Sequence, residues 1–188
     1  MALIESNMMA LGTIAPAFNL QDTVSDKLIS LSELKSDVAT VIVFIYNHCP
    51  FVLHINSKLV AVANEYQSKG VQVIAISSND VSTHPQDGPK FMKEVAEKEG
   101  YSFPYLFDET QAIAKAYGAE CTPDFFMFDS NLKCVYRGRF DDSRPNMTAS
   151  TGRDLTNSLD KMLAHEEINT DQKPSIGCNI KWKHIHTK

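Results

Sequence analysis

The chain has 188 residues, an apolar content of 43%, a charged content of 22% and a formal net charge of -5. These values are typical of one globular domain with a substantial core. Its mild acidity and the lack of a run rich in lysine and arginine argue against nucleic acid as a partner. No segment has the roughly 18 consecutive apolar residues of a membrane-spanning helix, so we expect no membrane partner.

The N-terminal segment 1–15 lacks the pattern of a secretory signal, because it contains no lysine or arginine and no continuous apolar stretch. We therefore expect a cytoplasmic protein, in which thiols are normally reduced and disulfides are more often transient than structural. No two cysteines have the Cys-x-x-Cys spacing of a closed zinc site, and we expect neither a metal nor an organic cofactor. The cysteines are Cys49, Cys121, Cys134 and Cys178.

In chain order, apolar periodicity and turn residues predict a β-hairpin, a β-α-β unit, a helix-strand-helix segment, a second β-hairpin and a final helix. Residues 38–45 form a continuous apolar run typical of a strand buried on both faces. This order of elements predicts an α/β domain with a mixed sheet. The predicted strands are 16–20, 27–31, 38–45, 71–77, 105–108, 125–128 and 135–140, and the predicted helices are 50–69, 90–99, 110–117 and 152–165.

These elements divide the chain into an N-terminal arm (1–14), a domain (15–165) and a C-terminal tail (166–188). We expect the arm and the tail to have little regular structure, since neither shows a clear helical or strand period. The tail contains His184 and His186, which have no acidic or thiol neighbours in sequence and are not expected to bind a metal.

Cys49 lies at the predicted junction where the buried strand 38–45 passes into the helix that begins at Pro50. The N–H groups of a first helical turn have no partners within the helix, and the helix dipole is positive there, so a thiol at this position is shifted toward the nucleophilic thiolate. The alternative is a small buried hydrophobic residue, but the neighbouring His48 favours a reactive thiol. His48 is a candidate for stabilising the thiolate or relaying a proton.

Several stretches together resemble a known family: 47–52 around Cys49, 121–126 with Thr122 and Pro123, and the segments 15–20, 29–34, 136–145 and 173–182. They are similar to the peroxiredoxin-like, thiol-specific antioxidant (alkyl hydroperoxide reductase-related) members of the thioredoxin-like superfamily. The resemblance implies a thioredoxin-like fold, with three α/β/α layers, a central mixed sheet, an N-terminal β-hairpin extension and a C-terminal tail. It also implies that Pro123 is in the cis form and packs against Cys49.

For function, the resemblance implies a thiol-dependent oxidoreductase or antioxidant in which Cys49 reduces disulfides or peroxides. The expected partners are a peroxide or a protein client with a thiol or disulfide, and an external thiol reductant. Tyr46 stands where related proteins commonly have a second cysteine, three residues before Cys49. Ile42 and Tyr46 stand where typical peroxiredoxins have the proline and threonine of their peroxide-binding loop. The alternative is therefore a non-catalytic binding module that keeps the fold without redox turnover.

Cys121, close to Pro123 in sequence, is the first candidate for a cysteine that resolves oxidised Cys49, with simple packing as an equal alternative. Cys178 could resolve Cys49 if the tail docks over the site, or could anchor the tail by packing; an external thiol is the third possibility. Cys134 is expected to be structural. Arg139 is a candidate for reaching the thiolate or an anionic substrate. The alternative is that the charged set around it, residues 137–144, forms ion pairs within itself on a solvated strand and loop.

Overall fold

Strand β4 (Ala39–Phe44) is the centre of the fold, and every one of its residues is buried. It pairs in parallel with β5 (Val71–Ser77) and antiparallel with β8 (Asp124–Phe128), so the predicted mixed sheet is confirmed. The apolar run predicts this place, because a strand with neighbours on both sides and layers on both faces is buried along its whole length. Its polar residue, Thr40, is buried as well, and its hydroxyl accepts a hydrogen bond from the Ser36 amide. The computed structural model describes residues 3–183, so His184 and His186 lie outside the described residues.

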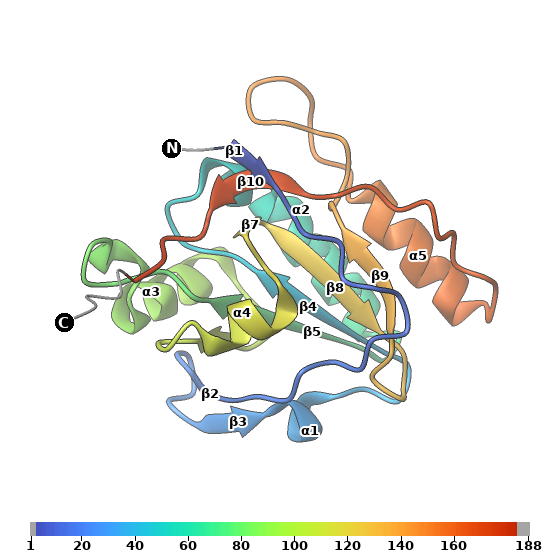
Figure 1. The fold of residues 1–188 in the computed structure, drawn as a ribbon, viewed down its shortest axis with the longest axis horizontal. Helices are drawn as coiled ribbons and strands as arrows, with labels where there is room; N and C mark the ends of the chain where they lie inside the picture. The colour runs from blue at the N-terminus through green and yellow to red at the C-terminus, as the bar shows by residue number, and fades with distance from the viewer. Residues whose placement is uncertain (1–2, 184–188) are drawn as a thin grey trace.

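The main sheet has both predicted hairpins at its two sides (Figure 1). The N-terminal hairpin extends it through β6, and β9 forms the opposite edge, as the alternation of polar and apolar residues in that strand indicates. The strand order is β3 (Leu28–Ser30), β2 (Asn19–Asp22), β6 (Tyr105–Phe107), β5, β4, β8 and β9 (Cys134–Gly138).

Helices cover both faces of this sheet and complete three layers. Successive side chains of a strand point to opposite faces, so Val41 and Val43 belong to one apolar cluster and Ile42 and Phe44 to the other. The first cluster takes in side chains of α2 (Pro50–Gln67), α3 (Pro89–Glu99) and α5 (Arg153–Leu163). The second takes in side chains of α1 (Leu31–Leu34) and α4 (Ala112–Tyr117). A short 3₁₀ turn, η1 (Pro85–Asp87), precedes α3.

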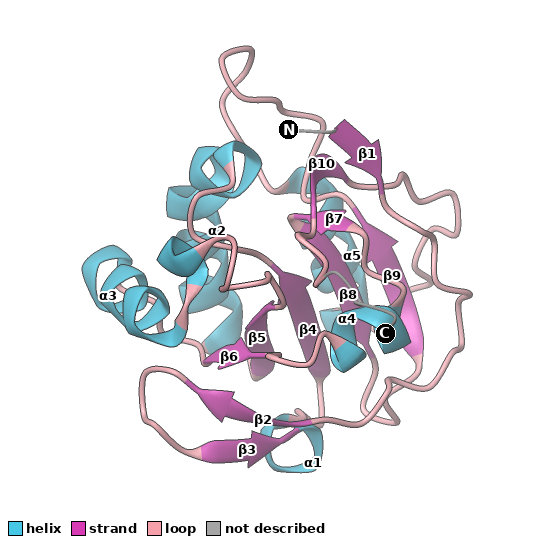
Figure 2. Cartoon of the chain, turned by 60° about the vertical axis from the view of Figure 1, so that its left-hand side comes forward, coloured by secondary structure: helices cyan, strands magenta, loops and turns pink. Residues whose placement is uncertain are grey.

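A second sheet joins the arm and the tail to the domain. Its strand order is β1 (Leu3–Glu5), β10 (Ile176–Asn179) and β7 (Cys121–Thr122), all antiparallel. These strands lie side by side beyond the end of β4 that leads into α2 (Figure 2). The short strands β1 and β10 are the regular structure that the arm and the tail contain, and the sequence analysis did not predict them. Strands of two to four residues are too short to show a period of two, and their partners are distant in sequence.

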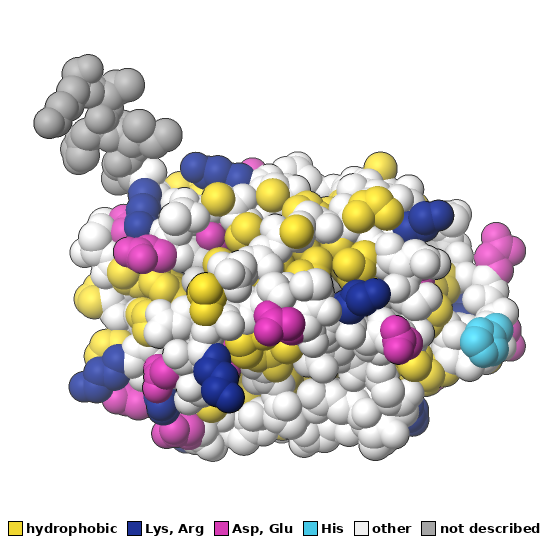
Figure 3. All heavy atoms as spheres, turned by 90° about the horizontal axis from the view of Figure 1, so that it is seen from below, with side chains coloured by type: hydrophobic (Ala, Val, Ile, Leu, Met, Phe, Trp, Pro, Cys, Tyr) yellow, Lys and Arg dark blue, Asp and Glu magenta, His cyan; other side chains and the backbone are white. Residues whose placement is uncertain are grey.

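The surface agrees with the mixed charge of the sequence. On the face drawn in Figure 3, acidic and basic side chains are interspersed among hydrophobic ones. Among the residues that the structure describes, no helix has the length and apolar character needed to cross a bilayer.

Phe126 tests the aromatic packing of the second cluster, because it is fully buried and its ring meets Phe44 and Tyr117 edge-on, with centroids 5.9 Å and 5.6 Å away. We expect Phe126→Ala to lower the free energy of unfolding by about 3–5 kcal/mol, through lost transfer energy and the cavity left behind. Denaturant unfolding measures this loss. The control is Leu53→Ala, at a side chain that is 61% exposed, with a change under about 0.5 kcal/mol. Equal losses for the two variants would contradict the placement of Phe126.

Candidate active site

The backbone places Cys49 at the strand-to-helix junction that the sequence predicts. Cys49 is the N-cap residue of α2, with extended backbone angles, and Pro50 occupies the first helical position, where its missing N–H is not needed. The Cys49 amide donates a hydrogen bond to the Tyr46 carbonyl over 3.3 Å. The side chain is completely buried, so the thiol lies under other parts of the chain rather than at an open surface.

The Cys49 thiol meets the segment that precedes β8. Its Sγ donates a hydrogen bond to the Thr122 carbonyl oxygen over 3.3 Å, joining residues 73 positions apart. The Thr122–Pro123 peptide bond is cis. The thiol makes no capping hydrogen bond to the first turn of α2. The oxygen of Thr122 is therefore the direct polar partner of the Cys49 sulfur.

The C-terminal tail brings a second thiol to the same place. In the pairing of β10 with β7, Cys178 lies opposite Thr122, and Asn179 lies opposite Cys121. Burial, and next the nearby Cys49 thiol, raise the pKa of Cys178 to about 11. The sequence leaves two roles open for Cys178, anchoring the tail by packing or reaching Cys49 from a docked tail. In the structure the tail lies over Cys49, and Cys178 lies beside Cys49.

Cys121 occupies a different environment. In the pairing of β10 with β7, Cys121 lies opposite Asn179 rather than opposite Cys178. Its Sγ lies 3.9 Å from the Ser175 carbonyl oxygen. Burial, and next the neighbouring Asp124, raise the pKa of the Cys121 thiol far above its usual range, which disfavours the nucleophilic form.

Cys134 lies on β9 within the second apolar cluster, and its Sγ donates a hydrogen bond to the Tyr136 carbonyl over 3.6 Å. It is buried, and its apolar cluster is not the one to which Cys49 and Cys178 belong. This packing agrees with the structural role expected for it.

His48 is held by a buried carboxylate. Its Nδ1 lies 2.8 Å from Asp87 Oδ2, and Asn79 Nδ2 donates to the same oxygen over 2.8 Å. The His48 ring also stacks on His84, with centroids 5.3 Å apart and planes 1° from parallel. Within residues 3–183, no hydrogen bond joins His48 to Cys49. The structure thus fixes the orientation of this imidazole through η1 and leaves its predicted relation to the thiolate indirect.

Tyr46 lies among the thiols, at the position where related proteins commonly have a cysteine. Its ring is buried, and Lys181 Nζ approaches its hydroxyl to 3.4 Å. Burial, and next the nearby Cys49 and Cys178, raise the pKa of the Tyr46 hydroxyl, which keeps it a hydrogen-bond donor. Sequence reasoning did not assign a role to Tyr46, Lys181 or Asp87. Lys181 lies within the segment 173–182, which carries the family resemblance, so the sequence offers a signal for it. Asp87 lies in a polar loop, where no sequence pattern marks it as part of a site.

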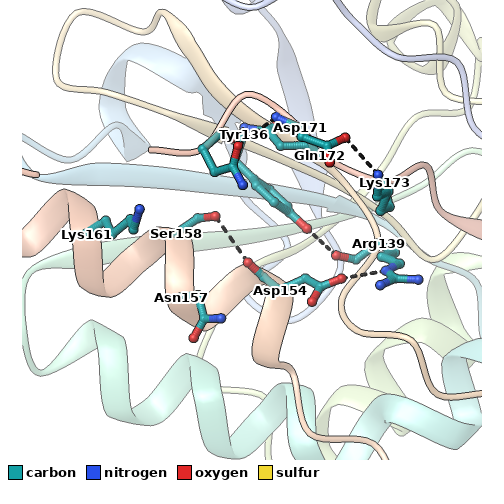
Figure 4. Close-up of a pocket in the computed structure, with 10 residues that line it drawn as sticks. Tyr136, Arg139, Asp154, Asn157, Ser158, Lys161, Asp171, Gln172 and Lys173 are labelled. Atoms are coloured by element: carbon teal, nitrogen blue, oxygen red, sulfur yellow. Dashed lines mark hydrogen bonds and ion pairs between the residues drawn. The ribbon is translucent and has the colours of Figure 1, made fainter. Parts of the chain in front are cut away.

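Arg139 turns toward Asp154 of α5 (Figure 4). Its Nε forms an ion pair with Asp154, and both residues line a cavity of about 380 Å³ between β9, α5 and the segment 169–173. Arg139 also borders a small hollow beside Pro123. Among the described ion pairs, none joins two members of the charged set 137–144, so the expectation of pairing within that set is wrong. The physical reason is that Asp141 accepts backbone and hydroxyl hydrogen bonds instead.

Asp141 organises the loop that follows β9. It accepts hydrogen bonds from the Ser143 amide over 2.9 Å, the Ser150 hydroxyl over 2.7 Å and the Gly152 amide over 2.6 Å. Burial opposes the ionisation of Asp141, but these hydrogen bonds outweigh it and lower its pKa to about 2. The loop therefore closes around one carboxylate, next to the hollow that Pro123 and Arg139 border.

This carboxylate gives the stability of the protein a specific acid dependence. A folded-state pKa below the unfolded value stabilises the protein above about pH 4, and the stabilisation is lost as the pH falls toward the folded pKa. We expect Asp141 to contribute about 1–2 kcal/mol at neutral pH, after allowing for solvent screening. Denaturant unfolding of wild type and Asp141→Asn at pH 6 and pH 3 measures this. At pH 6 the variant should have a lower free energy of unfolding than the wild type, and it should lose less of that free energy between pH 6 and pH 3. Equal losses in the two proteins would contradict the lowered pKa of Asp141.

No group of three or more potential metal ligands is found in the described part of the chain. The site consists of thiols, a phenol, an ammonium group and a histidine–aspartate pair. Such groups suit sulfur nucleophilic chemistry, in which a thiolate attacks an electrophilic oxygen or sulfur atom.

Comparisons with known proteins agree with this geometry. Residues 11–137 match the model of the AhpC/TSA family, a span that includes Cys49 and Pro123. The chain belongs to the AhpC/TSA family. Family membership confirms the resemblance inferred from the sequence and supports a thiol-dependent redox role. No curated protein sequence matches the chain.

Two solved structures are similar to this AhpC/TSA-family chain over nearly its whole length. An uncharacterized conserved protein from Geobacillus kaustophilus is 54% identical, with a TM-score of 0.96, and 97% of each chain is covered. A hypothetical protein from Sinorhizobium meliloti 1021 is 44% identical, with a TM-score of 0.92, covering 95% of this chain and 98% of that one.

A more distant match is the thioredoxin domain of a thiol-disulfide oxidoreductase from Bacteroides vulgatus. It is 19% identical, with a TM-score of 0.65, covering 83% of this chain and 99% of that one. At this identity the likeness shows the fold alone, and the expected thioredoxin-like fold is confirmed.

Proposed function

We propose that this AhpC/TSA-family protein is a thiol-dependent oxidoreductase in which Cys49 reduces a peroxide or a disulfide. The observation that carries the proposal is the position of the Cys49 sulfur, which lies between the N-terminus of α2 and the Thr122 carbonyl before Pro123. The N-terminus of an 18-residue helix favours negative charge on a nearby sulfur as it develops.

The chemistry begins with attack of the Cys49 thiolate on an electrophilic atom. With a peroxide, an S–O bond forms while the O–O bond breaks, the sulfur loses two electrons, and the departing oxygen takes up a proton. The product is a sulfenic acid. With a disulfide, an S–S bond forms between Cys49 and the client while the client's second sulfur leaves as a thiol.

Turnover then requires a second thiol and, in the end, an external thiol reductant. The reductant restores the Cys49 thiol by supplying the two electrons that the substrate received. A compartment with a reducing thiol pool, such as the cytoplasm, would supply it. The partners of the protein are therefore a peroxide or a disulfide-bearing client on one side and a dithiol donor on the other.

One observation favours the second candidate, a binding module without turnover: the Cys49 side chain is fully buried. In addition, Tyr46 replaces the local partner cysteine. A thiol that no oxidant reaches serves as a small packed residue. The two candidates differ in one measurable property, the ability of Cys49 to react in the folded protein.

The test is oxidation of the folded, full-length protein by hydrogen peroxide and, separately, by glutathione disulfide. Free thiols are blocked with an alkylating reagent at timed intervals, and mass spectrometry identifies the state of each cysteine. We expect Cys49 to be oxidised at least about tenfold faster than Cys134, because burial raises the pKa of the Cys134 thiol to about 11 and so disfavours its nucleophilic form. In Cys49→Ser, the fast phase should disappear.

Cys134→Ser is the matched control, since it removes another buried cysteine outside the site and should keep the fast phase. If Cys49 stays a free thiol with both oxidants while a small model thiol is oxidised, the proposed function is wrong and the binding module is favoured.

A further inference from the structure

We propose that Cys178 is the resolving cysteine for oxidised Cys49, delivered by a C-terminal tail that folds back as β10 against β7. This inference rests on the proposed function, because it assigns the second half of a reaction that Cys49 begins. It selects one of the three resolving thiols that the sequence leaves open.

The register of β10 on β7 carries the inference. Cys178 lies directly opposite Thr122, and the Cys49 sulfur lies 3.3 Å from the oxygen of the same Thr122. Residues opposite each other in an antiparallel pair have Cα atoms about 4.5–5.5 Å apart, with side chains on the same face. The two cysteines therefore approach one residue from two elements, Cys49 from α2 and Cys178 from β10.

Two glycines show that the tail is built to lie this close. A Cβ atom on Gly177 would lie 2.0 Å from the Thr122 carbonyl oxygen, and one on Gly138 would lie 2.0 Å from the Lys173 carbonyl oxygen. Real Cβ atoms essentially never approach closer than 3.0 Å. Only glycine permits both contacts, so the docking of the tail depends on these two positions and is not a loose association.

Hydrogen bonds hold the tail on both sides of Cys178. Before it, the Ser6 amide donates to the Ser175 carbonyl over 2.9 Å. After it, the Lys181 amide donates to Asn79 Oδ1 over 2.9 Å. Asn79 in turn donates to Asp87, the partner of His48. The tail is thus tied to the arm and to the polar network around the site.

The surroundings of Cys178 suit a resolving thiol better than those of Cys121. The Tyr46 hydroxyl and the Lys181 ammonium group both favour the thiolate of Cys178, although burial and Cys49 outweigh them and raise its pKa. Cys121 has a buried carboxyl group, Asp124, as its neighbour instead. Once Cys49 is a neutral sulfenic acid, its thiolate no longer opposes the ionisation of Cys178.

The reaction balances without any group beyond those named. The Cys178 sulfur attacks the sulfur of the Cys49 sulfenic acid, so the S–S bond forms as the S–O bond breaks. The hydroxyl group leaves as water with the Cys178 proton. With a disulfide client, Cys178 displaces the client's remaining sulfur, which leaves as a thiol. An external dithiol then returns two electrons and restores both cysteines.

The first experiment maps the oxidised protein. Full-length wild type, Cys178→Ser and Cys121→Ser are treated with equimolar hydrogen peroxide, with or without dimedone to trap sulfenic acid, and peptide mass spectrometry locates disulfides and adducts. We expect a Cys49–Cys178 disulfide in wild type and in Cys121→Ser. In Cys178→Ser, this disulfide should be absent and the dimedone adduct at Cys49 should accumulate. Cys121→Ser is the matched control, because it replaces a buried cysteine in the same sheet.

The outcomes separate the two proposals. A Cys49–Cys121 disulfide, or a Cys49 sulfenic acid that persists in wild type while Cys178 stays free, would overturn the resolving role and leave the proposed function intact. A Cys49 that stays reduced would overturn both.

The second experiment keeps the Cys178 thiol but displaces the strand that carries it. In Gly177→Ala, the added methyl group collides with the Thr122 carbonyl and must push β10 away from β7. Misplacement by about 1 Å can slow a reaction between oriented groups by ~100-fold, so we expect disulfide formation to slow by at least tenfold. Trapping of the Cys49 sulfenic acid should be as fast as in wild type or faster, since the tail then covers Cys49 less. Disulfide formation at the wild-type rate would contradict delivery by β10.

Discussion

The carbonyl oxygen of Thr122 is the point at which the separate parts of this protein meet. It accepts the hydrogen bond of the Cys49 thiol, and Gly177 passes it at a distance that only a glycine allows. The sheet, α2 and the tail strand thus converge on one backbone group. A side chain at this position could be exchanged by mutation, whereas a carbonyl group is fixed by the course of the chain, so the site depends on backbone placement more than on any single side chain.

Burial of Cys49 follows from the same convergence. The strand that covers it, β10, has four residues and pairs on its outer side with the three-residue β1. Local opening of a peripheral segment costs less free energy than global unfolding, so β10 can separate from β7 transiently although its docked position is well defined. A buried thiol and a reactive thiol are therefore compatible here, provided that the tail opens locally while the main sheet stays intact.

The sequence predicts those features that local patterns encode. The bounds of β5 agree with the prediction, because the apolar run ends at Gly70 on one side and at polar residues on the other. Cys49 is placed correctly because a strand pattern ends and Pro50 begins a helix. The sheet of β1, β10 and β7 could not be predicted, since its register joins Cys178 to Thr122 across the length of the domain. For the same reason the sequence ranks Cys121, which is near Pro123 in the chain, ahead of Cys178.

The distance between the two proposed partner thiols has a physical consequence. With Tyr46 in place of a local cysteine, the partner of Cys49 stands 129 positions later in the chain. A disulfide across so long a loop restricts the unfolded chain strongly, by about 4–5 kcal/mol in the chain-entropy model. It also ties down the strand that covers the active site. The protein with free cysteines already buries Cys49, so the disulfide would hold β10 covalently in the position that it already occupies, and reduction would remove this restraint.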